Sequence, residues 1–137
     1  MEANKIIITG AATRMGAAIA KKLSRSGVEI VIHYNKSKTN AEKLQKKLIK
    51  NKTKVYLVKG DLSKEKDLKK IIKFAKSKMK YFDCLINNAS LFENDSLKNF
   101  TFKSWDKHLG VNLKAPAYLI KEFAKNTKGK KKWKQTK

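Results

Sequence analysis

The sequence predicts an α/β protein, a Rossmann-like doubly wound parallel sheet of about four strands that lacks the C-terminal strands of a complete fold. Three observations support this class. Short β-branched runs alternate with helical patterns, the first run passes directly into a glycine-bounded turn, and no apolar run reaches membrane-spanning length. We therefore expect right-handed β–α–β crossovers and helices on both faces of the sheet.

The N-terminal unit is predicted to be a strand, a tight turn and a helix. The apolar run at residues 5–9 is typical of a buried strand, and the small residues after it predict a turn. A helix is expected from residue 13 or 14 to residue 25, ended by Ser26 and Gly27. Its face toward the sheet consists of Gly16, Ile19, Ala20 and Leu23.

Two further strand–helix units follow. Strands are expected at residues 29–34 and 54–58, with a helix at residues 39–51 between them. The third helix is predicted to begin after Asp61-Leu62-Ser63, with Ser63 as the N-cap. Apolar residues at helical spacing define the buried faces of the two helices: Ala41, Leu44 and Leu48, then Leu68, Ile71, Ile72, Ala75 and Met79.

The last part of the predicted fold is a short strand, a polar loop and a long helix. The strand covers residues 83–87, the loop residues 91–100 and the helix residues 102–125. Pro116, the only proline, should kink or divide this helix because it cannot donate a backbone hydrogen bond. Trp105, Leu109, Leu113, Ile120 and Phe123 are among its apolar positions.

Charge and composition limit the possible classes of protein. The 137 residues include 34 basic and 11 acidic side chains, a formal net charge of +23. The lysines are spread over every helix without interleaved aromatic residues, so we interpret them as solvated faces and expect no nucleic-acid or membrane partner. Residues 1–125 are predicted to form the domain and 126–137 a lysine-rich disordered tail.

Two further expectations come from the N-terminus and from the cysteine. The N-terminus enters a strand almost at once, so we expect no signal peptide and a cytoplasmic location. Cys84 is the only cysteine and lies in an apolar stretch, which favours a buried, inert thiol. No metal site is predicted.

The turn after the first strand carries the clearest functional motif. It reads Thr9-Gly10-Ala11-Ala12-Thr13-Arg14-Met15-Gly16. Glycines allow the backbone to approach a pyrophosphate, and the N-terminus of the helix offers free N–H groups and a positive dipole end. The alternative is a glycine-rich β–α turn that binds no ligand.

This Thr-Gly-x-x-x-Arg-x-Gly turn resembles that of the short-chain dehydrogenase/reductase family, whose middle residue is usually glycine. Arginine at this position is similar to the pteridine reductase branch. The resemblance covers residues 6–123 and implies that Gly10, Arg14, Met15 and Gly16 contact a dinucleotide. It also implies a homo-oligomer, since family members often pair through the helix that begins near Trp105.

The end of the second strand indicates which dinucleotide binds. NAD-specific folds place a carboxylate here, whereas this chain has none before Glu42 and offers Lys36, Ser37 and Lys38. We therefore expect NADP(H), although the lysines could simply begin a solvated helix. The His-Tyr-x-x-Ser pattern also resembles that of pteridine reductases, in which residues at this place hold the 2′-phosphate. The resemblance therefore implies this role for His33, Tyr34, Asn35 and Ser37.

Four later positions also match the family. Asp61, followed by Leu62, is implied to contact adenine, although a helix-capping carboxylate is the alternative. The segment Asn87-Asn88-Ala89-Ser90 resembles the Asn-Asn-Ala-Gly motif of the family, which places Asn88 and Ala89 at the cofactor. By the same resemblance Ser90 and Phe92 line a pterin site, unless Phe92 only covers the core. Asn112 matches the helix asparagine that supports a proton-relay water.

In the family, the catalytic Ser and the Tyr-x-x-x-Lys pair lie beyond the next strand, and we expect this chain to end before that region. Tyr34-Asn35-Lys36-Ser37-Lys38 is the only match to that pattern, and it ends the second strand far from the nicotinamide, so we reject it as catalytic. We therefore expect a truncated product, for example of a reading-frame slip in a lysine tract, that is inactive by itself.

The resemblance implies an NADPH-dependent oxidoreductase that moves hydride to a C=N or C=O bond of a small molecule, with a pterin or dihydrofolate as one candidate substrate. Two alternatives remain open. One is a non-enzymatic NADP-binding module, and the other is a basic nucleic-acid-binding protein on the same scaffold.

Overall fold

The computed structural model describes residues 3–127, and within them four parallel strands form one sheet. The strands are β1 (Lys5–Ile8), β2 (Glu29–Tyr34), β3 (Lys54–Lys59) and β4 (Cys84–Ile86), in the order β3-β2-β1-β4. The chain winds from β1 outward to β3 and then returns to place β4 on the other side of β1. The predicted Rossmann-like class and its four strands are confirmed.

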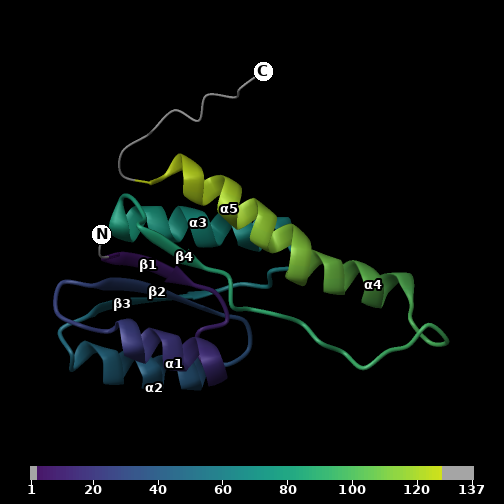
Figure 1. Ribbon diagram of the computed structural model, residues 1–137, viewed down its shortest axis with the longest axis horizontal. Coiled ribbons are helices and arrows are strands. Elements are labelled where there is room, and N and C mark those ends of the chain that lie inside the picture. Colours follow the sequence, from purple (N-terminus) through teal and green to yellow (C-terminus); the bar gives the residue numbers. More distant parts are fainter. Residues whose placement is uncertain (1–2, 128–137) are drawn as a thin grey trace.

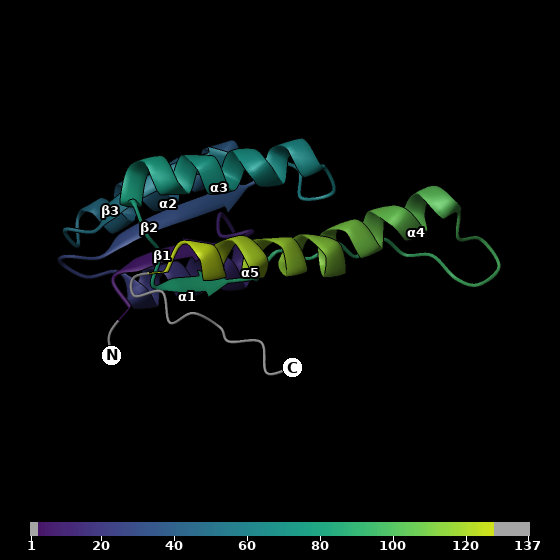
Figure 2. The same cartoon turned by 90° about the horizontal axis from the view of Figure 1, so that it is seen from above.

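Helices cover both faces of this sheet (Figure 1). α1 (Arg14–Leu23) and α2 (Lys38–Ile49) lie on one face. α3 (Glu65–Met79) and α5 (Ala115–Lys125) lie on the other. α4 (Phe102–Leu109) and the loop before it extend beyond the end of the sheet, as the turned view in Figure 2 also shows.

The alternation of side chains along the strands divides the core into two layers. Ile6 and Ile8 of β1 pack with the α1–α2 layer, whereas Ile7 between them packs with the α3–α5 layer. All three are fully buried. Successive strand residues point to opposite faces, so a strand covered on both sides has to be apolar throughout. The buried faces predicted for α2 and α3 are confirmed.

The predicted N-cap of the third helix is wrong. Lys64, not Ser63, occupies that position, and α3 begins at Glu65. The N–H and hydroxyl of Ser63 donate to Asp61 Oδ1 at 3.0 and 2.7 Å. The hydroxyl is therefore engaged by the preceding carboxylate and makes no cap hydrogen bond.

The long C-terminal helix is divided near its proline, as predicted. Between α4 and α5, η1 (Gly110–Lys114) is wound as a π-helix, and Pro116 stands in the first turn of α5. Proline has no N–H to donate to the carbonyl of Asn112, four residues earlier, so a regular α-helical ladder cannot continue through this point.

β4 forms one edge of the described sheet. Beside it, the Phe82 N–H donates to the Asn126 carbonyl at 3.0 Å, and Phe82 forms a parallel bridge with Thr127. The first two residues of the predicted tail are thus hydrogen-bonded or bridged to the body of the domain. Residues 128–137, the rest of that predicted tail, lie outside the described residues. Within residues 3–127, none of the helices is long and apolar enough to cross a membrane.

Candidate dinucleotide-binding site

A cleft of about 840 Å³ opens where the carboxyl ends of the strands meet. It lies at the point where the chain reverses its direction of winding, between β1 and β4, which is where open α/β sheets bind ligands. Every residue predicted to bind the cofactor lines this cleft: Gly10, Arg14, Met15, Gly16, His33, Tyr34, Asn35, Ser37, Asp61, Leu62, Asn88 and Ala89. Ser90, predicted to bind substrate, lines it as well.

The turn after β1 depends on two glycines. Gly10 has a φ of 61°, and a Cβ there would lie 2.9 Å from Ala89 Cα. A Cβ on Gly16 would lie 2.6 Å from both the Gly10 carbonyl oxygen and Asn88 Nδ2. Both contacts are too short for a side chain, so the turn, the start of α1 and the loop after β4 can approach only without one.

Thr9 and Asn88 hold the β1 turn against the loop after β4. Asn88 Nδ2 donates to the carbonyls of Thr9 at 2.9 Å and Gly10 at 3.1 Å. In return, Thr9 Oγ1 accepts from the backbone N–H groups of Asn88 and Ala89. Thr9 was not among the predicted site residues, although a hydroxyl at the end of an otherwise apolar strand was the available signal.

His33 holds the same turn from the other side. It is 2% exposed, and its Nδ1 accepts from the Gly10 N–H at 3.1 Å. Its Nε2 lies 2.9 Å from the Gly60 carbonyl oxygen. Desolvation by burial lowers the pKa of His33, which favours the uncharged ring. Although His33 lines the cleft, both of its ring nitrogens are already engaged by backbone groups.

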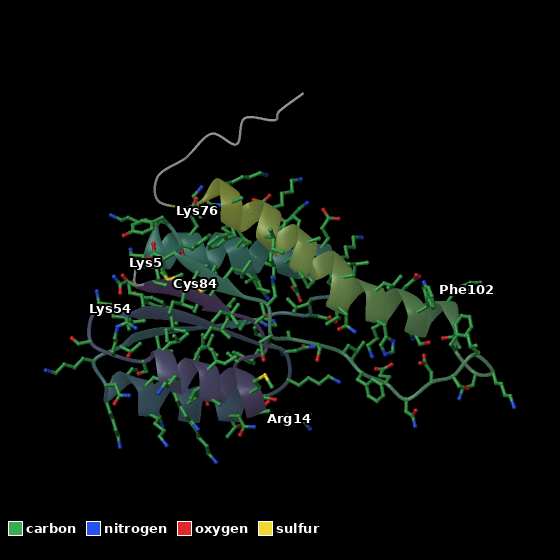
Figure 3. All side chains as sticks on the ribbon, viewed as in Figure 1. Lys5, Arg14, Lys54, Lys76, Cys84 and Phe102 are labelled. Carbon is green, nitrogen blue, oxygen red and sulfur yellow. The ribbon has the colours of Figure 1, made fainter. Side chains whose placement is uncertain are left out.

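Two cations of the cleft are free to meet an anion. In Figure 3, Arg14 lies at the end of α1 that points away from Lys5 and Lys54. Arg14 and Lys36 both line the cleft, and neither forms an ion pair within residues 3–127. Lys38 pairs instead with Glu42. The cleft therefore carries two positive charges, at Arg14 and at Lys36 beside Ser37, that no ion pair in the described residues compensates.

Asp61 lies on the β3 side of the cleft, where its carboxylate is partly engaged. Burial acts to raise its pKa, but the hydrogen bonds from Ser63 and the charge of Lys64 outweigh burial and lower it. The carboxylate is thus ionised at neutral pH and available as an acceptor. Its predicted contact with adenine stays a prediction.

The other end of the cleft contains four residues that were not predicted from the sequence. Leu91, Glu93, Lys107 and Val111 line it together with Ser90. Lys107 forms an ion pair with Glu93, and the hydrogen bond in this pair lowers the pKa of the Glu93 carboxyl. They come from the long loop and the C-terminal helices, so no short sequence motif connects them.

Two predicted residues lie outside the cleft lining. Phe92 is 87% exposed, so the alternative that it covers the core is wrong, and its contact with a pterin stays a prediction. Asn112 lies in η1, where its amide donates to the Leu91 carbonyl and accepts from the Leu91 N–H, both at 2.8 Å. In this structure Asn112 holds the loop after β4, and its role with a relay water stays a prediction.

These features fit a dinucleotide. The volume of the cleft is within the range of cofactor sites. Because Gly10 and Gly16 have no side chains, backbone atoms are exposed at this part of the cleft. The first N–H groups of α1 have no partner within the helix. No group of three or more metal-ligating side chains occurs in the part of the chain that the structure describes.

Comparison with known proteins identifies the relatives of this chain. Residues 4–133 match the protein family described as short chain dehydrogenase. The curated short-chain dehydrogenase/reductase FrzI from Cladobotryum sp is 31% identical over 114 residues, which is 83% of this chain and 44% of that protein. The 3-oxoacyl-[acyl-carrier-protein] reductase FabG from Staphylococcus epidermidis is 27% identical and is covered to the same 44%.

Solved structures share both the fold and the partial coverage. FolM alternative dihydrofolate reductase 1 from Brucella canis, complexed with NADP, has a TM-score of 0.83 and 30% identity, over 91% of this chain and 50% of that one. A short chain dehydrogenase from Burkholderia cenocepacia, also in complex with NADP, has a TM-score of 0.85 and 25% identity, over 90% and 51%. The chain thus spans about half the length of the proteins it resembles.

Proposed function

Because this chain belongs to the short-chain dehydrogenase family, we propose that it is the dinucleotide-binding part of a reductase that uses NADPH. The observation that carries this proposal is that two cations without ion-pair partners in the described residues line the cleft: Arg14 at the start of α1 and Lys36 just after β2. A cofactor with a 2′-phosphate needs cations at this place, whereas NADH needs a carboxylate.

Each part of the cleft has a defined task in this proposal. The N-terminus of α1 and the glycine turn bind the pyrophosphate, and Arg14, Lys36 and Ser37 bind the 2′-phosphate. Asp61 accepts from the adenine, while Asn88 and Ala89 lie along the nicotinamide ribose. The bound cofactor supplies the hydride, and these residues fix the position from which it leaves.

We further propose a C=N or C=O bond as the hydride acceptor, with a pterin or dihydrofolate as the substrate of the whole protein. Support comes from Ser90 at the cleft, from the exposed Phe92 two residues later, and from the 30% identity with the FolM dihydrofolate reductase. The 137 residues contain only one Tyr-x-x-x-Lys, at Tyr34–Lys38, and it ends β2. We therefore expect this chain by itself to bind the cofactor without turnover.

A calorimetric titration with NADPH and NADH tests the cofactor. We expect the chain to prefer NADPH, and Arg14→Ala to weaken NADPH about tenfold while changing NADH little, since an arginine–phosphate hydrogen bond is a strong one. Lys22→Ala is the matched control, because it removes one positive charge from an exposed position of α1 outside the cleft. Equal affinity for both nucleotides, or equal effects of the two substitutions, would contradict the proposal.

A further inference from the structure

His33 is a buried titratable side chain. The proposed function gives it no role beyond the phosphate contact that the family resemblance implies. It is the fifth of six residues in β2, between β1 and β3 in the sheet. Its ring reaches the Gly10 N–H on one side and the Gly60 carbonyl on the other. Its own carbonyl accepts from the Ala11 N–H at 3.0 Å. The two consecutive N–H groups of Gly10 and Ala11 in the glycine turn thus both donate to His33.

The two hydrogen bonds of the ring specify its protonation. Gly10 offers an N–H, so Nδ1 has to accept, and Gly60 offers a carbonyl, so Nε2 has to donate. Only the uncharged ring with its hydrogen on Nε2 satisfies both. The loops that it joins, after β1 and after β3, both line the cleft, through Gly10 and Asp61.

We propose that His33 is a positioning residue: its uncharged imidazole holds the turn that receives the pyrophosphate against the loop after β3, and its protonation loosens that turn and weakens dinucleotide binding. The inference rests on the proposed function, because it concerns affinity for the same nucleotide. This positioning role takes the place of the phosphate contact that the family resemblance implies for His33.

The surroundings of the ring support this role. Asp61 in the loop after β3 and Asp67 on α3 favour the charged ring, whereas Lys70 on α3 opposes it. The β1 turn presents only the uncharged Gly10 and Ala11 on the other side. Burial outweighs the acidic groups and lowers the pKa. A proton added to Nδ1 would point directly at the Gly10 N–H, so two donors would face each other and the bond would be lost.

Two substitutions separate the contacts of the ring. His33→Asn places an amide oxygen near the position of Nδ1, so it keeps an acceptor for Gly10 and cannot titrate. His33→Gln places an amide nitrogen near Nε2, so it keeps a donor for Gly60 and leaves the Gly10 N–H unpaired. Leaving a buried donor unpaired corresponds to about tenfold in an equilibrium constant. We therefore expect His33→Gln to bind NADP about tenfold more weakly than His33→Asn.

The pH dependence gives a readout that a merely structural role would not change. NADP, the acid-stable oxidised form, is titrated calorimetrically into the full chain at about pH 8 and at the lowest pH at which both proteins remain folded, because burial places the pKa of His33 below the ordinary histidine value. The wild type should lose about tenfold more affinity between these values than His33→Asn. The ratio of the two proteins cancels the titration of the ligand's own phosphate, which is common to both. Equal pH dependence in both would overturn the inference.

A measurement without ligand keeps this test separate from that of the proposed function. Nitrogen NMR of the imidazole at about pH 7 should show the neutral form with its hydrogen on Nε2, and the Gly10 amide should shift when the ring titrates. A ring that is charged at this pH, or that carries its hydrogen on Nδ1, would overturn the inference even if neither variant folds. A wild type that passes this test but binds no NADP at either pH would instead contradict the proposed function.

Discussion

At the scale of single residues, Arg14 combines a functional charge with an unfavourable backbone conformation. Its φ is 49°, in the left-handed region that glycine adopts freely and other residues adopt at a cost of about 1 kcal/mol. The usual family turn has glycine here. We therefore propose that arginine at this position is explained by the phosphate that its side chain binds rather than by the fold.

The substitution Arg14→Gly should separate these two effects. Because it relieves the backbone, we expect the free energy of unfolding to rise by up to about 1 kcal/mol, while affinity for NADPH falls about tenfold. Urea unfolding and calorimetric titration of the same protein measure both quantities. Arg14→Ala is the control, since it removes the charge without relieving the backbone. A stability equal to that of Arg14→Ala would show that the backbone conformation is not strained.

His33 makes a second prediction, which concerns stability rather than binding. Burial lowers its folded-state pKa below the ordinary value of 6.5, so in acid the unfolded chain takes up a proton that the folded chain resists. The free energy of unfolding should therefore fall as the pH drops below about 6.5 and should level off below the folded-state pKa. Urea unfolding across this range should show a shallower decline for His33→Asn. An identical decline in both proteins would assign the effect to other groups.

At the scale of elements, the C-terminal helices are attached to the domain by few side chains. Ala115 and Leu119 are the buried residues of α5, and α4 has none. Asn112 adds the two hydrogen bonds to Leu91 that tie η1 to the loop after β4. The partly buried Val111, Tyr118 and Phe123 pack against the same layer, so the far end of the cleft depends on the packing of α5.

Adjacent residues of α5 offer a matched test of this attachment. Leu119 is fully buried and Ile120 is 56% exposed. We expect Leu119→Ala to lower the free energy of unfolding by about 2–5 kcal/mol, because it leaves a cavity against α3, and Ile120→Ala to lower it by well under half of that. Thermal melts followed by circular dichroism measure both. Similar losses for the two would mean that α5 is packed differently.

At the scale of the whole molecule, exposed apolar side chains are concentrated in one region of the chain. Eight large ones lie between residues 92 and 120: Phe92, Leu97, Phe100, Phe102, Trp105, Leu109, Leu113 and Ile120. The same region extends beyond the sheet in Figures 1 and 2. Apolar surface of this kind favours association, which the net charge of +23 opposes by repulsion.

We expect the attraction between apolar surfaces to outweigh the charge repulsion, so that the protein self-associates as its concentration rises. Self-association should be stronger at high salt, because salt screens the repulsion. Sedimentation velocity over a range of concentrations measures this. Trp105→Lys with Leu109→Lys should shift the protein toward the monomer. Ile49→Lys, at an exposed apolar position of α2 on another face, should not. A monomer at every concentration would contradict the expectation.

The sequence by itself determined the elements, the parallel sheet and the part of the cleft lining that belongs to the predicted cofactor residues. Periodicity reports burial within a few neighbouring residues, which is why β2 was predicted with its observed bounds and the buried faces of α2 and α3 were correct. The glycine turn was recognisable because its spacing is local. The N-cap of α3 was missed because Ser63 had a competing partner in Asp61.

Only the tertiary structure decided which side chains make contacts with residues distant in the sequence. His33 meets Gly10 and Gly60, which are 23 and 27 residues away, and Asn112 meets Leu91 at a separation of 21. Phe92 extends into solvent, while Glu93 and Lys107 join the cleft from separate elements. Such contacts depend on which strands and helices become neighbours, and no pattern within one segment encodes that, because the hydrogen-bonding partner is chosen by the packing of the whole sheet.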